Sequence, residues 1–229
     1  MTTFISRREL LKRAGIVGAA VIVPADALAN VDAFPASPVQ APGTGGRPAL
    51  EHLTAAEAEV LDAVVARLIP SDATGAGALE AGATNYIDRA LGGALASSRQ
   101  GYNAGLAALT QFARTSHGKS FTELSAAEQD AVLIAVEAGT AAGFAGSAAF
   151  FNMVRTHTIQ GTFCDPYYGG NANFVGWDLL GYPGVRTIVT ADEQRLGAEV
   201  PRNHKSAYDY DMFTKASASL TSAERHHGD

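Results

Sequence analysis

The sequence predicts an all-α fold, a small irregular helical bundle with an aromatic- and glycine-rich C-terminal loop region and extended termini. Apolar residues recur at helical spacing in several segments between residues 54 and 160, whereas the alternation expected of a strand never persists for more than a few residues. Helix-start signals recur as well. Thr54 with Glu57, and Ser125 with Glu128, have the three-residue spacing of a capping box.

These signals place five helices in the middle of the chain. The first ends before Pro70, because proline cannot continue a helix. Asp72, Asp88 and Arg89 are interpreted as ordinary surface charges. The expected helices cover residues 54–69, 85–91, 98–117, a fourth segment that begins at Thr122 or Ser125, and 147–160.

The first 29 residues are interpreted as a twin-arginine export signal. A basic segment precedes an apolar stretch over residues 14–23, which is roughly half the length needed to cross a bilayer. The alternative is a membrane anchor or a basic N-terminus that arose by chance. Small residues at 27 and 29 allow cleavage, and an uncut signal would tether the protein. The signal residues are Ser6, Arg7, Arg8, Leu10, Leu11 and Lys12, and the cleavage site contains Ala27 and Ala29.

The export signal predicts a periplasmic location, and it leaves two alternatives for how a cofactor would be carried. Twin-arginine cargo is already folded in the cytoplasm, so either this chain carries a cofactor or it travels with a partner that does.

Residues 30–50 form a proline- and glycine-rich linker, and residues 51–184 form the helical domain. Residues 185–229 form a polar tail, which we expect to wrap over another surface or to stay mobile.

Composition excludes several classes of function. The chain has a net charge of −6, which disfavours nucleic acid and anionic membrane as partners. A single cysteine, Cys164, excludes an internal disulfide, a CxxC metal site, a haem attachment motif and an iron–sulfur cluster held by this chain alone. His157, Cys164 and Asp165 form the one group of candidate metal ligands. The competing interpretation of His157 is structural, because a lone histidine on a helix is more often a hydrogen-bonded core residue.

The most specific pattern lies between residues 150 and 184. A helix carries His157-Thr158 and Gly161, a turn reads Asp-Pro-Tyr-Tyr-Gly-Gly-Asn from 165 to 171, and Gly-Trp and Gly-Tyr-Pro-Gly follow at 176 and 181. This pattern resembles the gluconate 2-dehydrogenase subunit 3 family, the small subunit of three-part membrane-associated flavin dehydrogenases. The resemblance covers about residues 1–24 and 51–184.

The resemblance implies a non-catalytic subunit that holds no cofactor and no metal of its own. Its partner would be a flavoprotein similar to the glucose–methanol–choline (GMC) oxidoreductases, which holds FAD and oxidises a CH–OH donor such as gluconate, glucose or a polyol. A multihaem cytochrome c could form a third subunit. The small subunit would escort the flavoprotein through the twin-arginine translocase, stabilise it, and reach the inner membrane only through its partners.

The turn and the segment after it are the candidate partner interface, since aromatic residues in a loop offer rigid contact area. Cys164 is either a small buried residue or one half of an intersubunit disulfide formed after export. The alternative function is a self-contained periplasmic enzyme or metal-binding protein that uses His157, Cys164 and Asp165. The candidate interface residues are His157, Cys164, Asp165, Pro166, Tyr167, Tyr168, Asn171, Trp177 and Tyr182.

Overall fold

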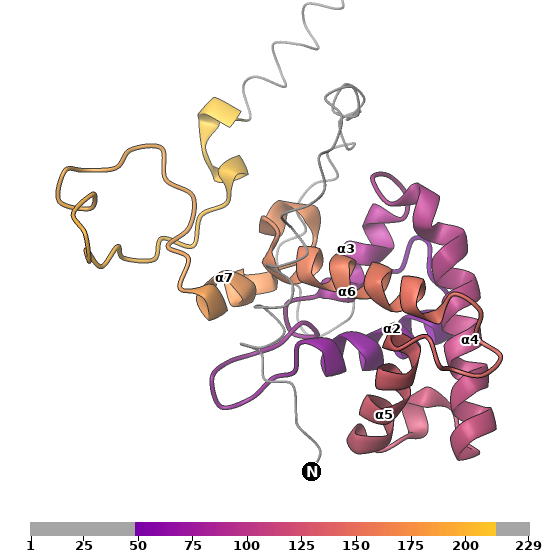
Figure 1. The fold of residues 1–229 in the computed structure, drawn as a ribbon. Helices are drawn as coiled ribbons and strands as arrows, with labels where there is room; N and C mark the ends of the chain where they lie inside the picture. The colour runs from indigo at the N-terminus through magenta and orange to yellow at the C-terminus, as the bar shows by residue number, and fades with distance from the viewer. Residues whose placement is uncertain (1–48, 214–229) are drawn as a thin grey trace, which may run out of the picture. The chain divides into compact units, whose positions relative to one another are not determined.

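A computed structural model describes residues 49–213 of the 229-residue chain (Figure 1). The proposed export signal, its cleavage site and nearly all of the linker lie outside these residues. No helix within the described part has the length and apolar character needed to cross a membrane.

The two predicted capping boxes are present and begin helices α2 (Ala55–Leu68) and α5 (Ala126–Glu137). The Glu57 carboxylate accepts hydrogen bonds from the backbone N–H and hydroxyl of Thr54 at 2.9 and 2.8 Å. Ser125 and Glu128 repeat this arrangement before α5, so the choice between two starts for this helix is settled in favour of Ser125. The competing start lies in a short 3₁₀ turn, η3 (Phe121–Glu123).

Two glycines in the left-handed conformation lie at helix boundaries, one before α3 (Ala83–Ala90) and one after α4 (Arg99–His117). Gly82 has a φ of 71° and begins α3 two residues earlier than the apolar pattern predicts. Gly118 has a φ of 73° and ends α4 at the expected place. A 3₁₀ turn, η2 (Ala96–Ser98), leads into α4.

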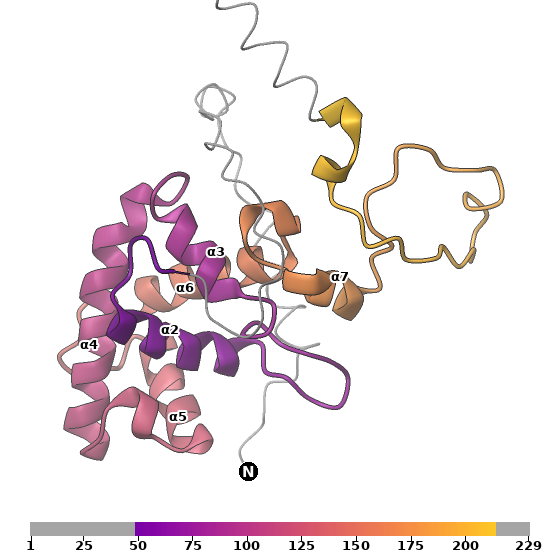
Figure 2. The same ribbon diagram turned by 180° about the vertical axis from the view of Figure 1, so that it is seen from behind.

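Helix α6 (Ser147–Phe163) is the centre of the domain and packs against α2, α3, α4, α5 and α7 (Figures 1 and 2). It crosses α4 at Gly105, where a Cβ atom would collide with the ring of Phe150. Phe150, Phe151 and Val154 of α6 are all buried. The residues from 49 to 213 contain no strand, which confirms the predicted all-α class.

Asp88 on α3 is buried, so its interpretation as a surface charge is wrong. Only 2% of the residue is exposed. Its two carboxylate oxygens accept hydrogen bonds from the backbone N–H groups of Glu51, His52 and Leu53 at 2.7, 3.0 and 2.7 Å. This carboxylate fixes the start of the domain onto α3, and its charge is compensated by three backbone donors.

The region expected to be a loop after α6 contains short helices. η4 (Pro166–Tyr168) and η5 (Ala172–Phe174) lead into α7 (Val175–Leu180), which buries Trp177. Further along, η6 (Ala207–Asp209) returns to the turn that follows α6. Helix α6 itself continues three residues beyond its predicted end at Gln160.

Candidate functional site

His157 lies in the interior of the domain. It is 8% exposed, and its Nδ1 lies 3.0 Å from the hydroxyl of Tyr102, whose ring stacks against the imidazole with centroids 5.8 Å apart. Burial lowers the pKa of His157 and raises that of Tyr102, which favours the neutral form of both groups. The contacts of this histidine are therefore structural, and burial leaves its side chain little surface for a partner.

Asn171 organises the turn after α6 from within. It is fully buried, with a φ of 44°, and its Nδ2 donates to the Cys164 carbonyl at 2.8 Å. Its Oδ1 accepts from the Gly176 N–H at 2.8 Å, and its own N–H donates to the Gly161 carbonyl at 2.8 Å. One amide side chain thus joins the end of α6 to the start of α7, a role inside the chain rather than at its surface.

Trp177 closes the same region. It is 6% exposed and its Nε1–H donates to the Phe163 carbonyl at 3.0 Å. Tyr182 packs edge-on against the indole, with ring centroids 4.9 Å apart, and remains 41% exposed. Of this pair, Tyr182 is the residue that offers surface to a partner.

Asp165 joins the turn to the tail of the chain. Its Oδ1 accepts from the Tyr167 N–H at 3.0 Å and from the Ser206 hydroxyl at 2.6 Å, while Oδ2 accepts from the Ala207 N–H at 2.9 Å. Pro166 occupies the first turn of η4, where its missing N–H is not needed. Both oxygens of this carboxylate are therefore occupied by donors from the chain itself.

Three tyrosines lie over this junction, and we call Tyr167, Tyr168 and Tyr208 the tyrosine cluster. The rings of Tyr167 and Tyr208 stack with centroids 3.6 Å apart, and the hydroxyls of Tyr168 and Tyr208 lie 3.0 Å apart. The hydrogen bond with Tyr168, reinforced by burial, raises the pKa of Tyr208 to about 12. Sequence reasoning missed Tyr208, although the capping-box spacing of Ser206 and Asp209 beside it marks an ordered element.

Cys164 is partly buried at the end of α6. Its thiol donates to the Gly161 carbonyl at 3.6 Å, and burial raises its pKa to about 12. The residue is therefore a thiol at neutral pH, with little thiolate for metal binding or nucleophilic attack.

The structure does not bring His157, Cys164 and Asp165 together as a metal site. His157 bonds to Tyr102, whereas the oxygens of Asp165 are bonded to residues of the tail. Across residues 49–213, no group of three or more histidine, cysteine, aspartate and glutamate side chains could hold a metal ion. The metal-binding form of the alternative function therefore has no support among these residues.

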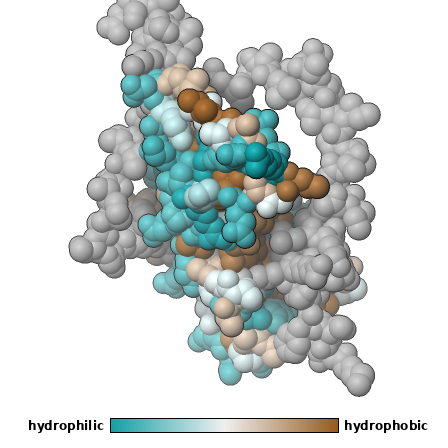
Figure 3. Space-filling model, turned by 90° about the vertical axis from the view of Figure 1, so that its left-hand side faces the viewer, coloured by the Kyte–Doolittle hydropathy of each residue, from teal (hydrophilic) through white to brown (hydrophobic). Residues whose placement is uncertain are grey.

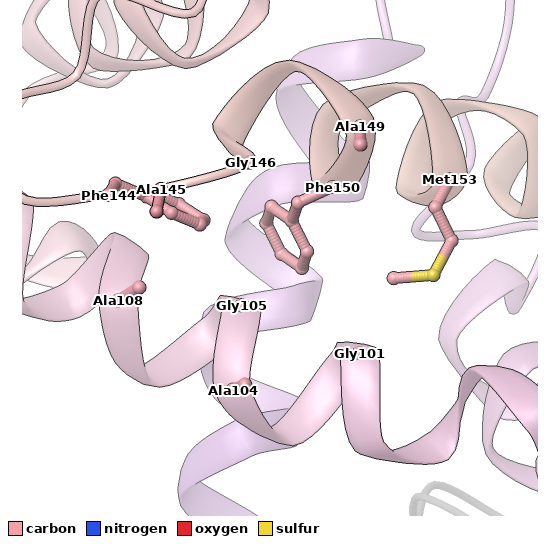
Figure 4. A pocket seen from close by; sticks show the side chains of 10 residues that line it. All are labelled: Gly101, Ala104, Gly105, Ala108, Phe144, Ala145, Gly146, Ala149, Phe150 and Met153. Carbon is pink, nitrogen blue, oxygen red and sulfur yellow. The ribbon is translucent and has the colours of Figure 1, made fainter.

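A groove of about 420 Å³ lies between α4 and α6 (Figure 4). Small residues of α4 form its floor, and the Phe150 and Met153 side chains of α6 stand over them. None of the lining side chains can donate a proton, accept one or attack a substrate, so the groove offers apolar contact only. It is lined by Gly101, Ala104, Gly105, Ala108, Phe144, Ala145, Gly146, Ala149, Phe150 and Met153.

Comparison with known proteins places this arrangement in a family. The family model described as gluconate 2-dehydrogenase subunit 3 matches residues 55–184, which is more than half of the chain and spans α2 to α7 together with the turn after α6. No curated protein and no solved structure gives a significant match. The family's name denotes a subunit of a dehydrogenase complex. The chain belongs to the gluconate 2-dehydrogenase subunit 3 family.

Proposed function

We propose that this chain is the non-catalytic small subunit of a periplasmic FAD-dependent dehydrogenase complex, in which the GMC-type partner oxidises a CH–OH donor such as gluconate, glucose or a polyol. The observation that carries the proposal is the family match over residues 55–184. It is supported by the internal bonding of the candidate reactive groups, since His157 and Asp165 already have partners within the chain. FAD would belong to the catalytic subunit, and haem c to a cytochrome subunit where one is present.

The second part of the proposal is that the small subunit takes its folded partner across the inner membrane. The arginine pair at residues 7 and 8 supports it, because a twin-arginine signal on one subunit suffices for a complex that folds before export. Membrane association would then arise through the partners.

Co-expression of the two subunits with a tag on the small subunit tests both parts. A periplasmic extract of the wild type should yield a larger polypeptide with flavin absorption on the tagged chain. The Arg7→Lys, Arg8→Lys precursor should leave both polypeptides in the cytoplasm. Arg13→Lys makes the same chemical change outside the pair and should be exported normally. A flavoprotein that reaches the periplasm without the arginine pair would refute the escort role, and a tagged chain that elutes alone would refute the partnership.

Cys164 extends the proposal to a covalent link between the subunits. Cys164 is only partly buried, and a cysteine of the partner would join it in a disulfide as the two electrons and two protons of the thiols pass to the thiol-oxidising system of the periplasm. Electrophoresis of the purified complex with and without reductant tests this link. A disulfide gives one band of summed mass that separates on reduction, and a Cys164→Ser variant should abolish that band; unchanged mobility in the wild type would contradict the link.

A further inference from the structure

Residues 185–205 form an arm that leaves the helical domain after α7 and returns to the same point (Figure 1). Its two ends are joined by backbone hydrogen bonds, from Val185 N–H to the Lys205 carbonyl at 3.1 Å and from Asn203 N–H to the Pro183 carbonyl at 2.9 Å. The Asn203 side chain adds a third bond, to the Val185 carbonyl at 2.8 Å. The arm is therefore a loop whose two ends are bonded to each other, and we call these ends, residues 183–185 and 202–205, the neck. The arm begins just beyond the residues that the family model covers.

The neck is fixed to the domain by further contacts. Asp178 of α7 accepts hydrogen bonds from Arg202 at 2.8 Å and lies 2.9 Å from His204 Nε2. The His204 ring stacks on Phe174, with centroids 5.0 Å apart and planes 7° from parallel. Directly after the arm, the chain is held again by the Asp165 carboxylate. These contacts set the direction in which the arm projects.

Polar bonds also tie the arm across its own width. Arg186, near the start, forms an ion pair with Glu193 at 2.9 Å and donates to the Pro201 carbonyl near the other end. The Glu193 carboxylate also accepts from the Thr190 N–H at 2.8 Å. These bonds hold the loop in this shape without an apolar core of its own.

Three large apolar side chains of the arm are exposed to solvent. Ile188 is 79% exposed, Val189 is 49% exposed, and Leu196 is fully exposed. On the face shown in Figure 3, apolar residues stand out among hydrophilic ones. Exposed apolar side chains on a loop that internal bonds hold in shape are typical of a contact surface, since exposed apolar area is unfavourable and such a loop loses little entropy on binding.

We propose that this arm grips the catalytic subunit of the dehydrogenase, with Ile188, Val189 and Leu196 inserted into an apolar depression on that subunit. The inference rests on the proposed function above. The three side chains together can bury roughly 200–300 Å², far below the about 800 Å² that each partner contributes to a stable interface. The interface area that this arm alone could bury is therefore too small to hold two proteins together. We infer that the arm adds to an interface formed mainly by other residues. Family membership supplies the dehydrogenase subunit as the partner for that interface.

The test uses the full chain co-expressed with its flavoprotein subunit. An Ile188→Asp, Leu196→Asp variant places two charges on the arm at exposed positions, so the helical domain keeps its packing. Ile134→Asp is the matched control, because Ile134 is 55% exposed on α5 and undergoes the same change. The tagged chain is captured on a surface, and the dissociation of the flavin-containing subunit is followed in buffer. The circular dichroism of each variant reports its helical content.

The arm variant should release the flavoprotein at least about tenfold faster than the wild type, while Ile134→Asp should release it at the wild-type rate. Equal dissociation from the arm variant and the wild type would overturn the role of the arm and leave the proposed function intact. A wild-type chain that captures no flavin-containing subunit would overturn both. A wild-type chain that forms a dimer, lost in the arm variant, would identify a second copy as the occupant and would also overturn the proposal.

Discussion

Replacement of Asp88 by alanine should destabilise the domain by about 3–4 kcal/mol. The carboxylate accepts three backbone hydrogen bonds, and all three donors lose their partner in the variant. The N–H groups of Glu51 and His52 lie near the surface and can turn to water, so each loss is small. The N–H of Leu53 is buried with its residue, which is 5% exposed, and it carries most of the cost because nothing replaces its acceptor.

Urea denaturation followed by far-ultraviolet circular dichroism measures this loss. For a domain of this size the thermal midpoint should fall by roughly 10 °C, and the urea midpoint should fall in proportion to the lost free energy. Asp192→Ala is the control, since the Asp192 side chain is 82% exposed and forms only a surface ion pair with Arg195. Its effect should stay within about 0.5 kcal/mol. An Asp88→Ala variant that loses less than about 1 kcal/mol would refute the argument that burial makes these bonds strong.

Three further predictions follow from buried groups. Because burial raises the pKa of Cys164 to about 12, its native thiol should react with Ellman's reagent at pH 8 at least roughly thirtyfold more slowly than in denaturant, since the smaller thiolate fraction outweighs the greater nucleophilicity of a more basic thiolate; rates within about threefold of each other would contradict this. Because burial lowers the pKa of His157, its ring should titrate below the ordinary value in an NMR pH series, and stability should be lost as pH falls, since the unfolded state binds that proton more readily; a midpoint at or above about 6.5 would be inconsistent with this. A Gly105→Val variant should lose about 2 kcal/mol of unfolding free energy, because its side chain would collide with Phe150, whereas Ala107→Val on the exposed side of α4 should lose well under 1 kcal/mol; equal losses would contradict close packing at Gly105.

The sequence predicts those features of the fold that depend on local signals. The starts of α2 and α5 follow from capping boxes, in which a hydroxyl and a carboxylate three residues apart satisfy each other's backbone donors. Helix α7 was not predicted, because its start depends on left-handed conformations at Asn171, Asn173 and Phe174 that only the packed turn imposes.

The candidate site shows the same division between local and distant partners. The sequence marks the turn from 165 to 171 correctly, since proline, glycine and asparagine define it locally. It does not reveal that Asp165 bonds to Ser206, 41 residues away, or that Asp88 bonds to Leu53, 35 residues away. Such pairs depend on how the whole domain closes, and no residue near either carboxylate in the sequence indicates its distant partner.

The attachment of residues 51–53 to α3 has a mechanical consequence. Within the described residues, a pull transmitted along the chain from residue 49 reaches Glu51, His52 and Leu53 before it reaches α2. These three hydrogen bonds all end on the one Asp88 carboxylate, so part of such a load passes directly to α3. The first turn of α2 is therefore not the first part of the described chain to bear a pull that arrives from the N-terminal side.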